Sequence, residues 1–158
     1  MSDWDADSPR LRSNLAEVLR TLRDSAVRRD PPTIEAARQW QRDAMSGLDV
    51  PDPNYVGRFR GESGLETVRV RIGNRYGVSP IDVAEELRNF ERTIRRAIDV
   101  LDSRYPHESE LDEDGLAAVI DVSAWAHAEW VRIHPFANGN GRTARMWANW
   151  ILMRYGIP

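Results

Sequence analysis

Hydrophobic residues recur at spacings of three and four along most of the chain, which is the pattern of helices with one buried face. This pattern predicts helices over about residues 9–28, 33–47, 80–101, 116–133 and 141–155. Ser8 and Ser79 stand where N-caps are expected, and each is followed by a proline in the first turn. The predicted fold class is therefore mainly α.

Between residues 50 and 77 the helical pattern stops, and prolines and glycines interrupt the chain. One run in this region alternates apolar and charged residues with period two, and it consists of Thr67, Val68, Arg69, Val70, Arg71 and Ile72. Such alternation places the valines and the isoleucine on one face of a strand and both arginines on the other. We expect a short β-hairpin, or an extended flap, over about residues 55–73.

A length of 158 residues suits a single domain with one core. We expect residues 1–50 to form a helical extension packed on a core of residues 51–158. No apolar run is long enough for a membrane span, and the first residues lack an export pattern. The expected location is therefore cytoplasmic, with delivery to another cell as an alternative. The chain stops soon after its last predicted helix, so a truncated fragment is a further interpretation.

The charged residues exclude several kinds of site. All 22 basic residues are arginine, so no lysine is present for a phosphate-binding loop or a Schiff base. The chain has no cysteine, which excludes disulfides, thiolate metal sites and cysteine nucleophiles. A net charge of −3 argues against nucleic-acid binding through bulk charge. Any anion would be held by arginine or by backbone N–H groups.

The segment from His134 to Arg145 lies between the last two predicted helices and is rich in asparagine and glycine. Residues 138–141, Asn-Gly-Asn-Gly, can turn sharply and direct consecutive N–H groups into one concavity. That concavity lies at the N-terminus of the following helix, where an anion is favoured. Arg142 and Arg145 are three residues apart, so they share a helix face. These features predict a site for a di- or triphosphate.

His134 stands at the other end of the same segment. An imidazole with a pKa near neutrality is the natural general base for a hydroxyl that attacks phosphorus. Phe136 is expected to point inward and anchor the loop. The alternative is a plain helix–loop–helix turn in which the histidine only caps a helix.

The string HPFANGNGRTAR at residues 134–145 resembles the signature of the Fic family, H-x-F-x-[D/E/N]-G-N-G-R-x-x-R. The turn at residues 57–60 and the strand from Val68 to Ile72 resemble the family's flap. The resemblance implies a Fic fold, a helical core with a short β-hairpin flap. It also implies protein AMPylation, in which an adenylyltransferase moves AMP from ATP, with Mg²⁺, to a Ser, Thr or Tyr hydroxyl of a target protein.

The same resemblance assigns roles to residues of the motif. His134 would be the base that deprotonates the target hydroxyl. The inner phosphates would bind to Gly139, Asn140 and Gly141, and the outer phosphates to Arg142 and Arg145. The flap, residues 67–72, would dock the target segment by strand addition next to His134.

Two motif positions sharpen these expectations. Asn138 stands where many members have a metal-binding carboxylate, so we expect it to be a weak Mg²⁺ ligand. Gly141 is the second glycine of G-N-G, which Doc-like kinases of the superfamily lack. Its presence favours nucleotidyl transfer over a Doc-like phosphotransferase. The sequence also leaves open a non-catalytic nucleotide-binding regulatory domain and a purely structural module.

Inhibition is the least constrained feature. Many Fic proteins carry an inhibitory glutamate in [S/T]-x-x-x-E-[G/N], and residues 13–18 match this pattern up to Glu17, except that Val18 replaces Gly or Asn. Glu17 is thus a candidate inhibitory residue that would pair with Arg145, and a surface glutamate is the competing interpretation. A separate antitoxin protein is another candidate regulator.

Overall fold

Five α-helices and one small hairpin make up residues 6–158, the part of the chain that the computed structural model describes. The helices are α1 (Pro9–Val27), α2 (Ile34–Ala44), α3 (Val83–Arg104), α4 (Glu113–Ile133) and α5 (Asn140–Arg154). The hairpin pairs β1 (Arg71–Ile72) with β2 (Arg75–Tyr76), and single 3₁₀ turns lie at η1 (Pro53–Tyr55) and η2 (Pro80–Asp82). The predicted mainly α fold is confirmed. No helix of the described part has the length and apolarity needed to cross a bilayer.

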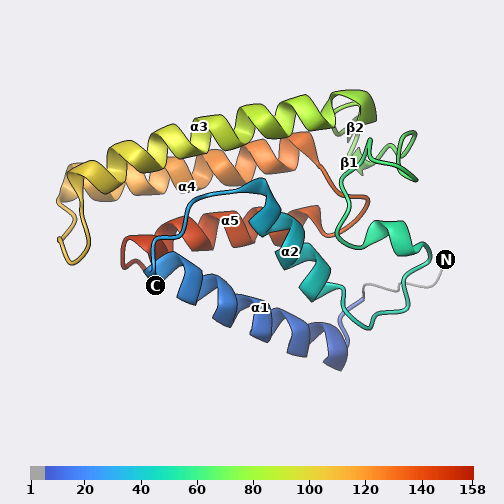
Figure 1. The fold of residues 1–158 in the computed structure, drawn as a ribbon, viewed down its shortest axis with the longest axis horizontal. Coiled ribbons are helices and arrows are strands. Elements are labelled where there is room, and N and C mark those ends of the chain that lie inside the picture. The colour runs from blue at the N-terminus through green and yellow to red at the C-terminus, as the bar shows by residue number, and fades with distance from the viewer. Residues whose placement is uncertain (1–5) are drawn as a thin grey trace.

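The helices form a layered bundle around α5 (Figure 1). Helices α3 and α4 run antiparallel along one side of α5, and α1 and α2 pack against its other side. The hairpin lies at the N-terminal end of α3. The loop from α4 to α5 lies at that same end of the bundle, so the topology brings the hairpin and the motif loop together.

One of the two predicted N-caps forms. The Ser8 hydroxyl accepts a hydrogen bond from the Leu11 N–H at 3.1 Å, which caps α1. The side chain of Ser79, however, makes no capping bond, so the prediction of a cap there is wrong. Its backbone carbonyl accepts from the Asp82 N–H at 2.9 Å instead, and this 3₁₀ turn leads directly into α3.

An aromatic cluster fills the core between α3, α4 and α5. Trp130, Trp147 and Trp150 are buried, and the ring centroids of Trp130 and Trp147 lie 5.1 and 5.2 Å from that of Phe90 in edge-to-face contacts. The same core includes buried residues of the first two helices, namely Val18, Leu22, Ala26, Ala37, Trp40 and Ala44. The division at residue 50 stays a prediction, and residues 1–5 of the expected extension lie outside the described part.

The hairpin is shorter than the sequence predicted, and its second strand lies beyond the expected bounds of about 55–73. The ladder joins only Arg71 to Tyr76 and Ile72 to Arg75, whereas the expected strand began at Thr67. After β2 the backbone no longer pairs with β1 and instead bonds to the end of α4, where the Val78 N–H donates to the Ile133 carbonyl at 3.2 Å.

The alternation of faces is confirmed along this segment. The side chains on one face, Val68, Val70 and Ile72, are half-buried, and those on the other, Arg69 and Arg71, are exposed. The period-two pattern therefore predicted correctly which face of the segment is buried, but it did not predict how many residues pair with a second strand.

Candidate functional site

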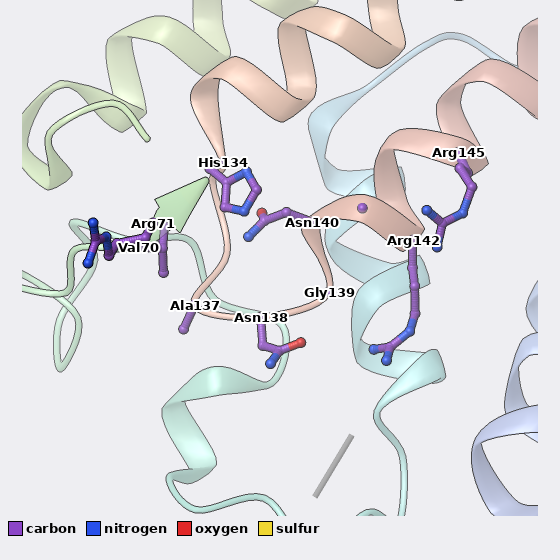
Figure 2. Close-up of a pocket in the computed structure, with 10 residues that line it drawn as sticks. Val70, Arg71, His134, Ala137, Asn138, Gly139, Asn140, Arg142 and Arg145 are labelled. Atoms are coloured by element: carbon purple, nitrogen blue, oxygen red, sulfur yellow. The ribbon is translucent and has the colours of Figure 1, made fainter. Parts of the chain in front are cut away.

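A cavity of about 410 Å³ opens between the motif loop, the start of α5 and the flap (Figure 2). It is lined by Val70, Arg71, His134, Ala137, Asn138, Gly139, Asn140, Gly141, Arg142 and Arg145. The structure thus brings together the seven motif residues expected at the nucleotide site and two of the six flap residues, whereas Phe136 of the motif lies in the core. The other four flap residues, Thr67, Val68, Arg69 and Ile72, do not line the cavity.

His134 ends helix α4 in a left-handed conformation, with φ of 53° and ψ of 58°. Its N–H still donates to the Trp130 carbonyl at 2.9 Å, and its Nδ1 lies 2.9 Å from the Val131 carbonyl oxygen. Because a carbonyl only accepts, Nδ1 carries the hydrogen and Nε2 keeps a lone pair. Figure 2 shows the ring over the loop, pointing toward the start of α5.

The surroundings of His134 favour its neutral form. Burial lowers the pKa of the imidazole, the hydrogen bond to Val131 raises it by less, and the charge of Arg60 lowers it further. The net effect places the pKa below the ordinary value of 6.5. At neutral pH the Nε2 lone pair is therefore available to accept a proton.

The side chain of Asn140 closes the motif loop. Its Oδ1 accepts from the Phe136 N–H and its Nδ2 donates to the Phe136 carbonyl, both at 2.8 Å, and the residue is 3% exposed. Phe136 itself is fully buried, as expected. Because both polar atoms of the Asn140 amide are used in the loop, this residue can offer a ligand only its backbone N–H.

The start of α5 has the form of an anion site. Gly139 adopts φ of +86° and leaves the helix without a side-chain cap. A Cβ at Gly139 would lie 2.7 Å from the Met45 Cε, so glycine fits this position best. The first N–H groups of a helix have no acceptor within it, and here they border the cavity.

Two arginines of α5 add positive charge to the same cavity. Arg142 is half-buried, whereas Arg145 is exposed and makes no ion pair with any residue of the described range. Both side chains line the cavity from successive turns of the helix (Figure 2). Guanidinium groups of this kind can hold phosphate oxygens through paired hydrogen bonds.

Arg60 supports the site and was missed by sequence reasoning, which placed it only in a turn. It is 1% exposed and donates to four carbonyls: His134 at 2.7 Å, Val78 at 2.8 Å, Ile133 at 2.9 Å and Val68 at 3.1 Å. Burial lowers its pKa to about 10. Arg60 therefore joins both arms of the flap to the backbone that presents His134. An arginine in a glycine-rich turn gives no sequence signal that separates it from a surface charge.

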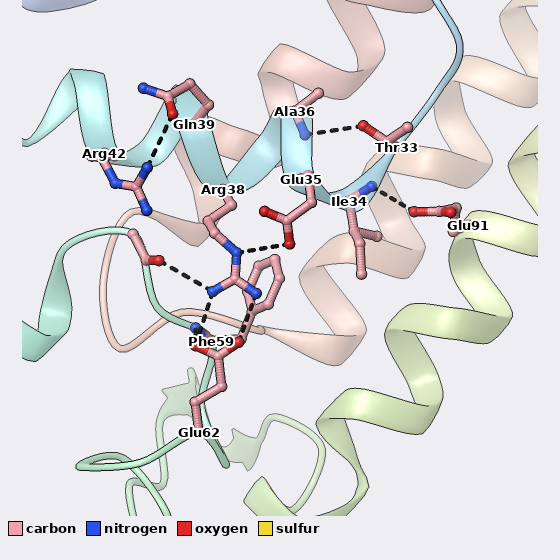
Figure 3. Close-up of polar contacts among 11 residues, drawn as sticks. Thr33, Ile34, Glu35, Ala36, Arg38, Gln39, Arg42, Phe59, Glu62 and Glu91 are labelled. Carbon is pink, nitrogen blue, oxygen red and sulfur yellow. Dashed lines mark hydrogen bonds and ion pairs between the residues drawn. The ribbon is translucent and has the colours of Figure 1, made fainter.

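Helix α2 holds the turn that carries Arg60 (Figure 3). Arg38 binds both carboxylate oxygens of Glu62, at 2.6 and 2.9 Å, and the carbonyl of Gly57 at 3.2 Å. Its guanidinium lies 4.1 Å from the centroid of the Phe59 ring. Burial acts to raise the pKa of Glu62, but the hydrogen bond and charge of Arg38 outweigh it and keep the pKa low. The turn is therefore fixed against α2.

Two further contacts tie the turn and α2 to the motif loop. The Arg60 N–H donates to the Pro135 carbonyl at 2.7 Å, which forms an isolated bridge between the two segments. The buried Gln41 accepts from the Gly57 N–H at 2.6 Å and donates to the Asn138 carbonyl at 3.3 Å. The loop is thus held from outside as well as through Asn140.

The cavity offers little to a metal ion. None of its lining residues carries a carboxylate, and residues 6–158 contain no cluster of three or more His, Asp or Glu that could hold a metal. The side chain of Asn138 lies at the cavity without a hydrogen bond to another described residue. One neutral amide oxygen fits a Mg²⁺ that arrives bound to nucleotide phosphates, and it does not form a complete site by itself.

Glu17 lies apart from the cavity. Its carboxylate pairs with Arg20 at 2.9 Å, and it borders a separate hollow with Asn14 and Asp43. The expected pairing with Arg145 is absent from the described residues. An inhibitory role for Glu17 stays a prediction.

Comparisons with known proteins agree with this geometry. Residues 31–152 match the family model described as Fic/DOC family. A protein adenylyltransferase of Caenorhabditis elegans is 38% identical over 111 residues, which are 70% of this chain and 18% of that protein. One of Drosophila persimilis is 34% identical over 141 residues, which are 89% of this chain and 23% of that protein. The chain thus spans about a fifth of the length of these curated relatives.

The solved structures include a Fic-domain-containing signalling protein of Bacteroides thetaiotaomicron. It superposes with a TM-score of 0.65 at 22% identity, over 91% of this chain and 47% of that one, and so shows a shared fold. The family model covers well over half of the sequence and includes the whole motif loop. The chain therefore belongs to the Fic/DOC family.

Proposed function

We propose that this chain is a protein adenylyltransferase that transfers AMP from ATP to a Ser, Thr or Tyr hydroxyl of a target protein. The observation that carries the proposal is the placement of His134, whose proton-free Nε2 faces a cavity bounded by the start of α5 and two arginines. A base beside an anion site is the pairing that attack on a phosphate ester requires. Relatives that share 34% and 38% identity with the chain are named protein adenylyltransferases.

The nucleotide would bind with its phosphates at the start of α5. Backbone N–H groups of Gly139, Asn140 and Gly141 would meet the inner phosphates, and Arg142 and Arg145 would meet the outer ones. Because the loop is fixed by internal hydrogen bonds, these donors need little rearrangement when charge develops at the α-phosphate.

The transfer then needs one displacement at the α-phosphorus. Nε2 of His134 takes the proton of the target hydroxyl as its oxygen bonds to that phosphorus. The bond from the α-phosphorus to the bridging oxygen breaks, and pyrophosphate leaves with that electron pair. The products are the AMP ester of the target, pyrophosphate and the protonated histidine, which later releases its proton to solvent.

The flap would place the target. The segment from Thr67 to Ile72 passes beside the cavity, and Val70 and Arg71 line it. A target strand added to the open edge of this segment would lie next to His134. The hydroxyl side chain would then point into the cavity.

Mg²⁺ is proposed to enter as part of the nucleotide complex. When bound, it would offset negative charge on the phosphates. Among the side chains that line the cavity, Asn138 would offer Mg²⁺ a neutral oxygen ligand, because the amide oxygen of Asn140 is already bonded within the loop.

Two other functions fit the observations less well. A Doc-like phosphotransferase is disfavoured because Gly141 completes G-N-G. A non-catalytic nucleotide-binding regulator would not need a histidine whose pKa is lowered at the cavity. We also propose that the protein acts as a toxin, that an antitoxin protein controls it, and that it is located in the cytoplasm.

Labelled ATP tests the proposed function directly. The protein is incubated with a lysate and with ATP labelled at either the α- or the γ-phosphate. Retention of the α-label alone in protein is the expected result. Retention of the γ-label would instead show kinase chemistry, and binding of ATP without transfer would show a regulator.

A further inference from the structure

The flap carries a concentration of positive charge that the proposed chemistry does not use. Because the expected flap residues pair with β2, the flap is taken from here on as residues 67–77. This segment contains three arginines and no acidic residue, in a chain whose net charge is −3. Arg69, Arg71 and Arg75 are all exposed, and none makes an ion pair with any residue from 6 to 158. By contrast Arg38 and Arg154 bind carboxylates at 2.6 Å. The flap arginines are therefore available to a partner.

Two of these arginines point to one side. Arg69 and Arg71 occupy the exposed face of the flap, and Val70 between them belongs to the half-buried face. Val70 and Arg71 both line the cavity, whereas Arg69 does not. The guanidinium of Arg71 lies 5.6 Å from the centroid of the Tyr76 ring across the hairpin, which limits its freedom. Figure 2 shows this side chain extending away from the motif loop, opposite to the arginines of α5.

The backbone between these arginines has one open edge. The Val70 carbonyl accepts from the Gly77 N–H at 3.0 Å, so Val70 faces the second arm of the flap. Since backbone groups of successive strand residues point to opposite edges, those of Arg69 and Arg71 point outward. The N–H and carbonyl of Arg69 make no hydrogen bond to any described residue. A target strand added here would pair with the backbone at residues 69 and 71.

We propose that the flap selects target segments in which the modified hydroxyl residue is flanked directly on both sides by acidic residues. This inference rests on the proposed function and names its substrate class. Residues of an added strand alternate between faces, about 7 Å apart on one face. A hydroxyl side chain opposite Val70 would face the cavity, and its two neighbours would face Arg69 and Arg71 within cross-strand reach.

Electrostatics explains why such a filter would sit on the flap. A nucleotide in the cavity is strongly negative, so it repels an acidic segment that approaches His134. Arg142 and Arg145 line the cavity and would bind the phosphates, so they would not offset this repulsion on the outer side. Arg69 and Arg71 supply positive charge on that side, where it attracts acidic neighbours and rejects basic ones.

Peptides of equal composition provide the test. A central Tyr, Ser or Thr in an alanine background is flanked by two aspartates either at −1 and +1 or at −2 and +2. With ATP labelled at the α-phosphate, we expect kcat/KM to be about tenfold higher for the −1/+1 peptide, and this preference should shrink at high salt. Equal rates for the two peptides would overturn the proposal.

Charge reversal adds a second arm with a matched control. The double variant Arg69→Glu/Arg71→Glu should invert the preference, so that arginine at −1 and +1 becomes favourable. Arg23→Glu/Arg96→Glu makes the same change in net charge at two exposed arginines without ion pairs in the described structure, and it should keep the original preference. Loss of preference in both variants would show an effect of net charge alone and overturn the proposal.

Binding measurements separate this proposal from the proposed function. If no peptide receives AMP, fluorescence anisotropy of the labelled −1/+1 peptide still reports whether Arg69 and Arg71 bind it. Binding that the flap variant loses supports the inference even when transfer fails. If oligothymidylate displaced the peptide as well as the unlabelled peptide does, these arginines would bind any polyanion, and the proposal would be overturned. If the flap variant lost ATP affinity as much as peptide affinity, the arginines would bind the nucleotide, and the proposal would again be overturned.

Discussion

The motif loop and the flap lie side by side at the cavity, yet they are built in opposite ways. The loop of residues 134–141 is held by the side chain of Asn140, by Arg60 and by Gln41, and Phe136 within it is fully buried. The flap of residues 67–77 has a two-residue ladder, exposed arginines and an unused backbone edge. One region is fixed from several sides and the other is left open.

This difference separates two tasks. Groups that stabilise a reacting phosphate work best when they are already in place, and a loop held by its own hydrogen bonds and by its neighbours meets that need. A region that accepts a variable partner needs free donors and acceptors, which the flap keeps. Arg60 connects the two regions, because it binds Val68 in the flap, Val78 directly after the flap and His134 in the loop.

The largest expected effect comes from the reacting group of the fixed loop. His134→Ala should lower AMP transfer by about 10³-fold, since general-base catalysis contributes this order of rate. ATP affinity should stay nearly unchanged, because the phosphate donors lie on α5. Single-turnover transfer and ATP titration measure the two quantities. Near wild-type transfer by the variant would show that another group is the base.

The link between the regions gives the next effect. Arg60→Met keeps a long side chain but removes the donors to four carbonyls, so we expect a loss of ~2–4 kcal/mol in the free energy of unfolding. Transfer should fall about 10²-fold, because His134 is then less well placed. The acid limb of kcat/KM should also move to higher pH, since the charge of Arg60 lowers the pKa of His134.

Arg60→Lys serves as the control for that substitution. It keeps the charge and loses the forked donors, so stability should fall while the acid limb stays close to that of the wild type. Denaturant unfolding and a pH series of kcat/KM report both. If Arg60→Met changes stability alone and leaves transfer and its pH dependence intact, Arg60 has no role in placing His134.

The sequence predicted the motif loop itself better than the residues that hold it in place. The helices, the buried Phe136 and the gathering of motif residues around one cavity follow from local patterns, since each is set by spacing or by backbone chemistry. Arg60 and Gln41 act through contacts with residues distant along the chain. No local pattern distinguishes them from ordinary surface residues, and only the fold brings their partners together.

The flap shows the complementary case. Alternation predicted which side chains are covered, because burial of one face imposes period two. It overestimated the strand, since Thr67 and Val68 have no partner strand opposite them among the described residues. The Val68 carbonyl binds Arg60 instead. The length of a strand depends on which segment the fold places opposite it, so it could not be predicted from the alternating segment itself.

A backbone substitution tests whether the open edge docks the target. Arg69→Pro removes an outward N–H, and Arg69→Ala removes the same side chain while keeping that N–H. Transfer to a protein target should be about tenfold lower for the proline variant than for the alanine variant, with equal ATP affinity. Indistinguishable transfer by the two variants would argue against strand addition at this edge.

The pH dependence of transfer reports on the burial of His134. Because burial lowers its pKa, the acid limb of kcat/KM should have its midpoint below the ordinary value of 6.5. The free energy of unfolding should also fall toward acid pH. The unfolded chain binds the proton at higher pH, so the stability due to His134 is present above 6.5 and falls as the pH drops through the folded pKa. A midpoint above 6.5 would contradict this environment.

The smallest expected effect concerns Asn138, the member of the fixed loop whose side chain is not bonded to another described residue. An amide oxygen attracts Mg²⁺ by its dipole alone, whereas a carboxylate adds a full charge. Asn138→Asp should therefore lower the Mg²⁺ concentration for half-maximal transfer, and Asn138→Ala should raise it by only about two- to threefold. Arg145→Ala should instead weaken ATP binding through lost phosphate contacts. A magnesium titration of the three variants separates these outcomes. If Asn138→Ala at saturating Mg²⁺ is as inactive as His134→Ala, the side chain of Asn138 takes part directly in the transfer, and the fixed loop contributes a second reacting group.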